Sequence, residues 1–73
     1  MIPISHPAWK KLVTGEKQIT SKQLGVNMLL HNNQLKYKAD PSPANVDKLV
    51  QHTYEYFQKY EQIFQSELQQ LQS

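Results

Sequence analysis

Apolar side chains recur at helical spacing through the C-terminal part of the chain, from Ser42 to Leu71. Alternating steps of four and three residues separate them, which is the spacing of one face of an amphipathic α-helix. The positions on this face are Val46, Val50, Thr53, Phe57, Tyr60, Phe64, Glu67 and Leu71, with Leu68 beside the one charged member. The opposite face is rich in Gln, Lys and Glu, which suits water. The pattern predicts one long helix over residues 43–71.

The residues around position 42 carry the signals of a helix start. Ser42 can accept a hydrogen bond from the first free N–H groups, and Pro43 loses nothing at the first helical position. No Gly or Pro follows Pro43, so the sequence offers no stop signal for this helix before position 71.

A first, shorter helix is predicted near residues 6–14. Pro7 fits its first turn, and Gly15 fits the left-handed residue that commonly ends a helix. A helix of this length does not stand alone, so its apolar face must dock on the rest of the chain. That face consists of Trp9, Leu12 and Val13. We expect Trp9 to be a packing anchor rather than a ligand-stacking residue, because its large apolar area favours burial.

A middle helix is predicted near residues 20–34, and it is apolar on two sides. One side holds Leu24, Met28, His31 and Leu35, and nearly opposite lie Ile19, Val26, Leu30 and Tyr37. A helix of this kind is usually buried on both sides. Gly25 weakens a helix interior by about 1 kcal/mol, and it can be tolerated where another backbone comes close. Asn32 and Asn33 predict an end between Asn33 and Lys36. A strand over residues 26–30 is the alternative, but it has few β-branched residues and no second strand to pair with.

These elements predict an all-α fold over residues 1–73, a small single domain of three helices. The short N-terminal helix is expected to pack on an antiparallel hairpin made by the middle helix and the long C-terminal helix.

The composition excludes several classes of protein. The 73 residues include no cysteine, so there is no disulfide framework, zinc–thiolate site or cysteine nucleophile. The first residues lack the basic and apolar regions of a signal peptide, and no apolar run approaches the length of a membrane span. We therefore expect a cytoplasmic protein with no membrane association.

The sequence contains few groups of residues with the types and spacing that catalysis needs. His52 and Glu55 have the spacing of metal ligands on one helix, but a di-metal site needs further converging carboxylates, and this pair falls on the polar face. His31 is expected to be a hydrogen-bonded, partly buried histidine. With two glycines in the chain, no phosphate-binding loop can be built. The sequence predicts a protein that is not an enzyme and takes no cofactor, metal or small-molecule substrate.

The charge is uneven along the chain. Residues 1–40 carry a net +4, from six lysines against Glu16 and Asp40, whereas residues 41–73 carry a net −2. The lysines are Lys10, Lys11, Lys17, Lys22, Lys36 and Lys38. They could form a weak, largely non-specific nucleic-acid contact, which is our alternative function. The absence of arginine and the acidic C-terminal helix favour a solvated surface instead.

The length of the predicted C-terminal helix gives the main functional hypothesis. Twenty-nine helical residues would span about 44 Å, whereas a compact chain of this size is about 29 Å across. The segment from residue 62 to residue 71 would then project from the domain with an exposed apolar stripe, which is typical of an interface.

We therefore predict a non-enzymatic protein-interaction module that binds itself as a homodimer or binds another protein. It would act as a small regulator, adaptor or inhibitor. The predicted contact residues are Tyr60, Ile63, Phe64, Leu68 and Leu71.

Overall fold

Four α-helices form the regular structure of this chain, and there is no β-strand. The computed structural model describes residues 1–73. The helices are α1 (Pro7–Thr14), α2 (Leu24–Ala39), α3 (Pro43–Lys59) and α4 (Gln65–Gln72). The predicted all-α fold is confirmed, although the number of helices and several of their bounds differ from the prediction.

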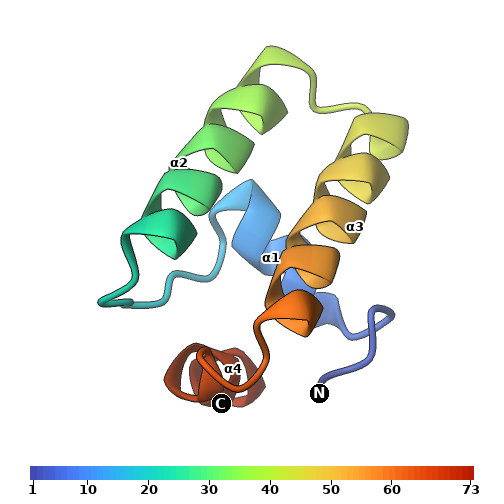
Figure 1. Cartoon of the computed structure of the whole chain (residues 1–73). Helices are drawn as coiled ribbons and strands as arrows, with labels where there is room; N and C mark the ends of the chain where they lie inside the picture. The colour runs from blue at the N-terminus through green and yellow to red at the C-terminus, as the bar shows by residue number, and fades with distance from the viewer.

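Helix α1 lies at the centre of the molecule and contacts the other three helices (Figure 1). Trp9 is completely buried, and the rings of Tyr54 and Phe57 meet it edge-on at centroid distances of 5.5 Å and 5.4 Å. The indole N–H of Trp9 donates to the carbonyl of Pro3 at 3.1 Å, which holds the N-terminal segment against the core. Trp9 is the packing anchor that the sequence predicted.

Local signals set both ends of α1. His6 is the N-cap, and its Nδ1 accepts a hydrogen bond from the N–H of Ala8 at 3.0 Å. Gly15 ends the helix with φ of 87°, a left-handed conformation that glycine adopts without strain. The predicted first helix near residues 6–14 therefore matches the structure.

Helices α2 and α3 lie side by side and run in opposite directions (Figure 1). Ser42 is the N-cap of α3, as predicted, and its hydroxyl accepts a hydrogen bond from the N–H of Asn45. The amide of Asn45 in turn donates to the carbonyls of Lys36 and Asp40, at 3.3 Å and 2.7 Å. Asn45 of α3 thus gives a partner to the carbonyl of Asp40, which follows α2, and adds a second donor to the Lys36 carbonyl, which already accepts from the Asp40 N–H.

The predicted bounds of the middle helix, residues 20–34, are wrong, because α2 runs from Leu24 to Ala39. It starts late because Thr20 and Ser21 form hydrogen bonds to α4. It continues past Asn33 because that side chain is buried and donates to the hydroxyl of Thr53 on α3 at 2.7 Å. Asn33 therefore joins two helices instead of ending one.

The predicted single helix over residues 43–71 is also wrong. Helix α3 ends at Lys59, a turn follows, and α4 folds back beneath the end of α3 (Figure 1). The longest dimension of the molecule is 31 Å, so a helix of about 44 Å has no place in it.

Burial explains why the chain turns at this point. Phe64, Leu68 and Leu71 are only 3%, 6% and 1% exposed, and they belong to the same core as Trp9 and Phe57. Burying a large apolar side chain is worth about 1.5–3 kcal/mol. A helical hydrogen bond on the surface contributes about 0.5–1.5 kcal/mol. Three buried side chains outweigh the few hydrogen bonds that the turn interrupts.

Candidate interaction surface

The five predicted contact residues divide into two groups. Phe64, Leu68 and Leu71 lie in the core, so they are not on the surface of this structure. Tyr60 and Ile63 lie in the turn between α3 and α4 and are 38% and 56% exposed. Only these two are accessible to a partner while α4 is docked.

A second apolar surface runs along the outer side of α2. Leu24, Met28 and Leu35 are 73%, 56% and 53% exposed. On an ideal helix they fall within about 40° of one another around the axis, and the buried Val26 and Leu30 lie on roughly the opposite side. We call these three residues the α2 stripe.

The sequence pattern contained the signal for the α2 stripe. It showed a helix that is apolar on two sides, and we expected both sides to be buried. The structure buries the Val26 side and leaves the α2 stripe exposed. His31, on the same side as the stripe, is exposed rather than partly buried.

A small groove opens beside the start of α2. Its volume is about 160 Å³, enough to admit one apolar side chain, and its lining is mainly apolar. The lining residues are Gln23, Gly25, Tyr56, Tyr60, Ile63 and Phe64. The groove therefore connects the start of α2 with the exposed residues of the α3–α4 turn.

Gly25 admits the Tyr56 side chain to this groove. A Cβ atom at position 25 would collide with the Tyr56 hydroxyl. The close approach at this glycine therefore involves a side chain and not a second backbone, which corrects our expectation.

The segment of the chain that carries the α2 stripe contains basic residues but no acidic ones. No Asp or Glu occurs from Lys17 to Ala39, whereas this segment contains four lysines. Lys36 and Lys38 are exposed on α2 itself. Lys38 is about 60° from Leu35 around an ideal helix, so it borders the stripe.

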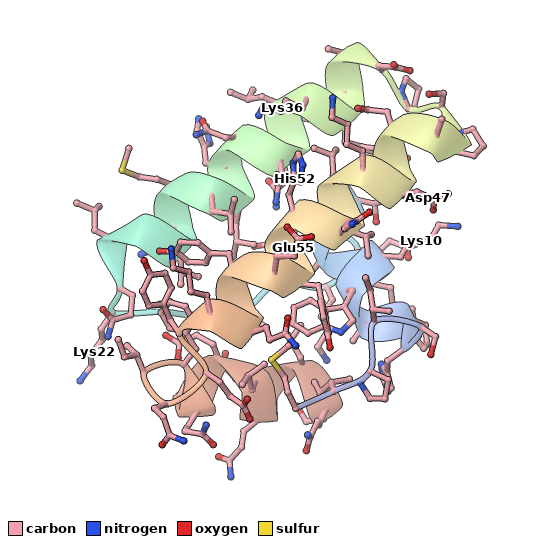
Figure 2. All side chains as sticks on the ribbon, turned by 45° about the vertical axis from the view of Figure 1, so that its right-hand side comes forward. Lys10, Lys22, Lys36, Asp47, His52 and Glu55 are labelled. Carbon is pink, nitrogen blue, oxygen red and sulfur yellow. The ribbon has the colours of Figure 1, made fainter.

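The six lysines considered for nucleic-acid contact do not converge on one surface. Figure 2 shows Lys10, Lys22 and Lys36 projecting from separate parts of the molecule. The ammonium group of Lys17 donates to the C-terminal carbonyl of Ser73 at 2.6 Å. Lys10 and Lys11 share one shallow hollow of about 420 Å³, but Glu16 also lines it.

Potential metal ligands are equally scattered. His52 and Glu55 are both exposed on the outer side of α3 (Figure 2). No group of three or more His, Asp or Glu side chains is placed to hold a metal ion. None of the four helices has the length and apolar character that crossing a bilayer requires.

Comparison with known protein families, with curated proteins and with solved structures finds no match to this chain.

Proposed function

We propose that this chain is a non-enzymatic protein-interaction module that acts as a small regulator or adaptor. The observation that carries the proposal is the α2 stripe, a row of exposed apolar side chains on a helix whose other side is in the core. Contiguous exposed apolar surface on a small protein typically marks a contact site. Tyr60 and Ile63, from the predicted contact set, extend this surface across the groove at the start of α2.

The charge around the stripe selects the kind of partner. The four lysines between residues 17 and 39, a segment that contains no Asp or Glu, favour an acidic partner and disfavour a basic one. A helix packs on a row of apolar residues at this spacing by offering apolar residues at its own i, i+3, i+4 and i+7 positions. The proposed partner is therefore an acidic amphipathic helix of another protein, with one apolar side chain in the groove.

The size of the surface sets the strength of the contact. Three side chains on α2, with two more at the turn, make an interface at the low end of the range for specific complexes. The contact should therefore be weak and reversible, as is usual for regulatory encounters. Basic residues around it should speed association and make the rate sensitive to salt.

NMR titration tests this proposal directly. The probe is a synthetic amphipathic peptide with leucines at helical spacing and glutamates elsewhere. We expect the largest chemical-shift changes at the α2 stripe and at Ile63, with saturation at or below about 1 mM peptide. A peptide with lysines in place of the glutamates should cause much smaller changes.

Charged substitutions supply the matched control. Met28→Glu combined with Leu35→Glu should weaken peptide binding at least tenfold, because it puts negative charge into the stripe. Gln51→Glu combined with Gln58→Glu adds the same charge to the exposed side of α3 and should have little effect. Equal loss in both variants, or shift changes confined to other surfaces, would contradict the proposal. Binding to anionic vesicles with no response to the peptide would assign the stripe to a membrane surface instead.

A further inference from the structure

The turn between α3 and α4 contains no residue that prevents a helix. Residues 60–64 are Tyr, Glu, Gln, Ile and Phe, without Gly or Pro. The apolar spacing also continues through the turn, since Phe57, Phe64 and Leu71 are separated by seven residues each. In a straight helix these three residues would therefore share one face.

Several N–H groups at the turn have no partner in the folded chain. No backbone or side-chain acceptor within the chain accepts a hydrogen bond from the backbone N–H groups of Glu61 and Gln62. The same is true of the first three N–H groups of α4, which belong to residues 65–67. Phe64, the N-cap of α4, supplies no capping side chain. A continuous helix from Pro43 to Gln72 would satisfy all five of these groups internally. The local sequence therefore favours the straight form, and the docking of α4 opposes it.

The polar contacts that hold α4 in place join parts of the chain that are remote in sequence. Ser21 donates its hydroxyl to the buried carboxylate of Glu67 at 2.5 Å. The backbone N–H of Thr20 donates to Gln70 Oε1 at 2.9 Å, and Gln70 Nε2 donates back to the Thr20 carbonyl at 2.8 Å. Lys17 reaches Ser73. Because 46 or more residues separate the partners of each bond, a second copy of the chain can supply the same groups.

We propose that two copies of this chain form a dimer by exchanging α4. In each copy α3 and α4 join into one helix. The α4 segment of each copy then docks on the other copy, where it contacts the loop at residues 17–21 and α1. The exchanged dimer keeps the hydrogen bonds and the burial of Leu68 and Leu71, and it adds the helical hydrogen bonds that the turn lacks. Exchange of an identical element is a low-cost route to a dimer.

Phe64 is the buried residue whose contacts differ between the monomer and the exchanged dimer. In the monomer it packs on rings of its own α3, at 5.4 Å from Tyr56 and 5.1 Å from Phe57. After straightening it lies seven residues from Phe57 on the same helix face, where it meets the equivalent surface of the other copy. This inference uses the α4 contact and not the α2 stripe, so it stands or fails independently of the proposed partner helix.

Two variants at one exposed position test the role of the turn. Gln62 is exposed and neither its N–H nor its side chain forms a hydrogen bond, so substitution there removes no hydrogen bond of the monomer. Gln62→Ala favours the straight helix and Gln62→Gly disfavours it. Because two turns straighten in each dimer, we expect the dimer dissociation constants of the two variants to differ by roughly 10- to 30-fold. Light scattering after refolding across a range of concentrations measures this difference.

Crosslinking distinguishes an exchanged dimer from an ordinary one. The chain has no cysteine, so Lys22→Cys and Ser66→Cys, at two exposed positions that line one hollow between the loop and α4, each introduce a unique thiol. The two single variants are mixed, unfolded, refolded together at high concentration and treated with a short bismaleimide. An exchanged dimer gives a covalent link between a Lys22→Cys chain and a Ser66→Cys chain, whereas docked monomers give none.

The Lys22→Cys/Ser66→Cys double variant is the positive control, because it must crosslink within one chain when α4 is docked on its own chain. A concentration-dependent dimer that forms the link between chains, and that is strengthened by Gln62→Ala, supports the proposal. A dimer without that link overturns it, as does a chain that remains monomeric up to about 1 mM in both the original and the Gln62→Ala forms.

Discussion

At the scale of single residues, Asn33 and Thr53 show how polar groups are accommodated inside this small core. Thr53 is fully buried and Asn33 is only 2% exposed. The Thr53 hydroxyl accepts from the Asn33 amide and donates to the carbonyl of Leu49, with both bonds at 2.7 Å. Buried polar groups are tolerated when they are hydrogen-bonded in this way. The pair also fixes the register of α2 against α3, since apolar contacts alone are less directional.

Thr53→Val tests this pair. Valine keeps the shape of threonine but removes the acceptor, so the buried amide of Asn33 loses its partner. We expect the free energy of unfolding to fall by about 1–3 kcal/mol, measured by urea denaturation. The double variant Asn33→Leu/Thr53→Val removes both polar groups and should recover part of the loss. A single variant as stable as the original chain would show that the amide finds another partner.

At the scale of elements, boundaries set by local chemistry were predictable and those set by distant contacts were not. His6, Pro7 and Gly15 define α1 within its own sequence, and Ser42 defines the start of α3. The start of α2 depends on α4, some 46 residues away, through Ser21 and Glu67. The end of α3 carries no sequence signal, because residues 60–64 contain neither Gly nor Pro and it is the burial of Phe64, Leu68 and Leu71 that accompanies the turn.

The same difference between local and distant contacts decides which residues of the candidate interaction surface could be predicted from the sequence. Tyr60 and Ile63 were predicted as contact residues, and they are exposed. Phe64, Leu68 and Leu71 were predicted from a projecting helix, and the turn brings them into the core instead. The α2 stripe was visible as a second apolar side, but periodicity cannot tell a surface buried in the same chain from one that is free. That distinction needs the arrangement of all four helices.

The burial of α4 changes what charged substitutions in it should do. Phe64→Glu combined with Leu68→Glu would place two carboxylates in the core, where unpaired charges are strongly unfavourable. Removing large buried side chains already costs about 2–5 kcal/mol each, and a small domain has only about 5–15 kcal/mol in total. We therefore expect this variant to lose its cooperative thermal transition, followed by circular dichroism.

Helix α4 offers its own control for that experiment. Gln65 and Gln69 are exposed on the same helix. Gln65→Glu combined with Gln69→Glu adds the same charge without entering the core, so the melting temperature should change little. Equal behaviour of the two double variants would mean that α4 is not docked as the structure shows.

At the scale of the whole molecule, the distribution of charge matters more than its total. The net charge is +2 and the isoelectric point is about 9.0, which alone would be compatible with a nucleic-acid partner. The structure, however, spreads the lysines over separate surfaces and places Glu16 in the same hollow as Lys10 and Lys11. A phosphate backbone needs several cations along one surface, because affinity rises with the number of phosphates that are neutralised together.

We therefore predict weak retention on duplex DNA at physiological salt. Because any binding would come from a few lysine–phosphate contacts, the slope of the logarithm of affinity against the logarithm of salt should be small, on the order of −2 to −3. Fluorescence anisotropy with a labelled duplex measures both quantities. Lys10→Gln combined with Lys11→Gln, which removes the one adjacent pair, should lower the residual affinity more than Lys48→Gln combined with Lys59→Gln on α3. Submicromolar binding at physiological salt, reduced by the first pair and unaffected by the second, would instead make the Lys10–Lys11 hollow a functional nucleic-acid site.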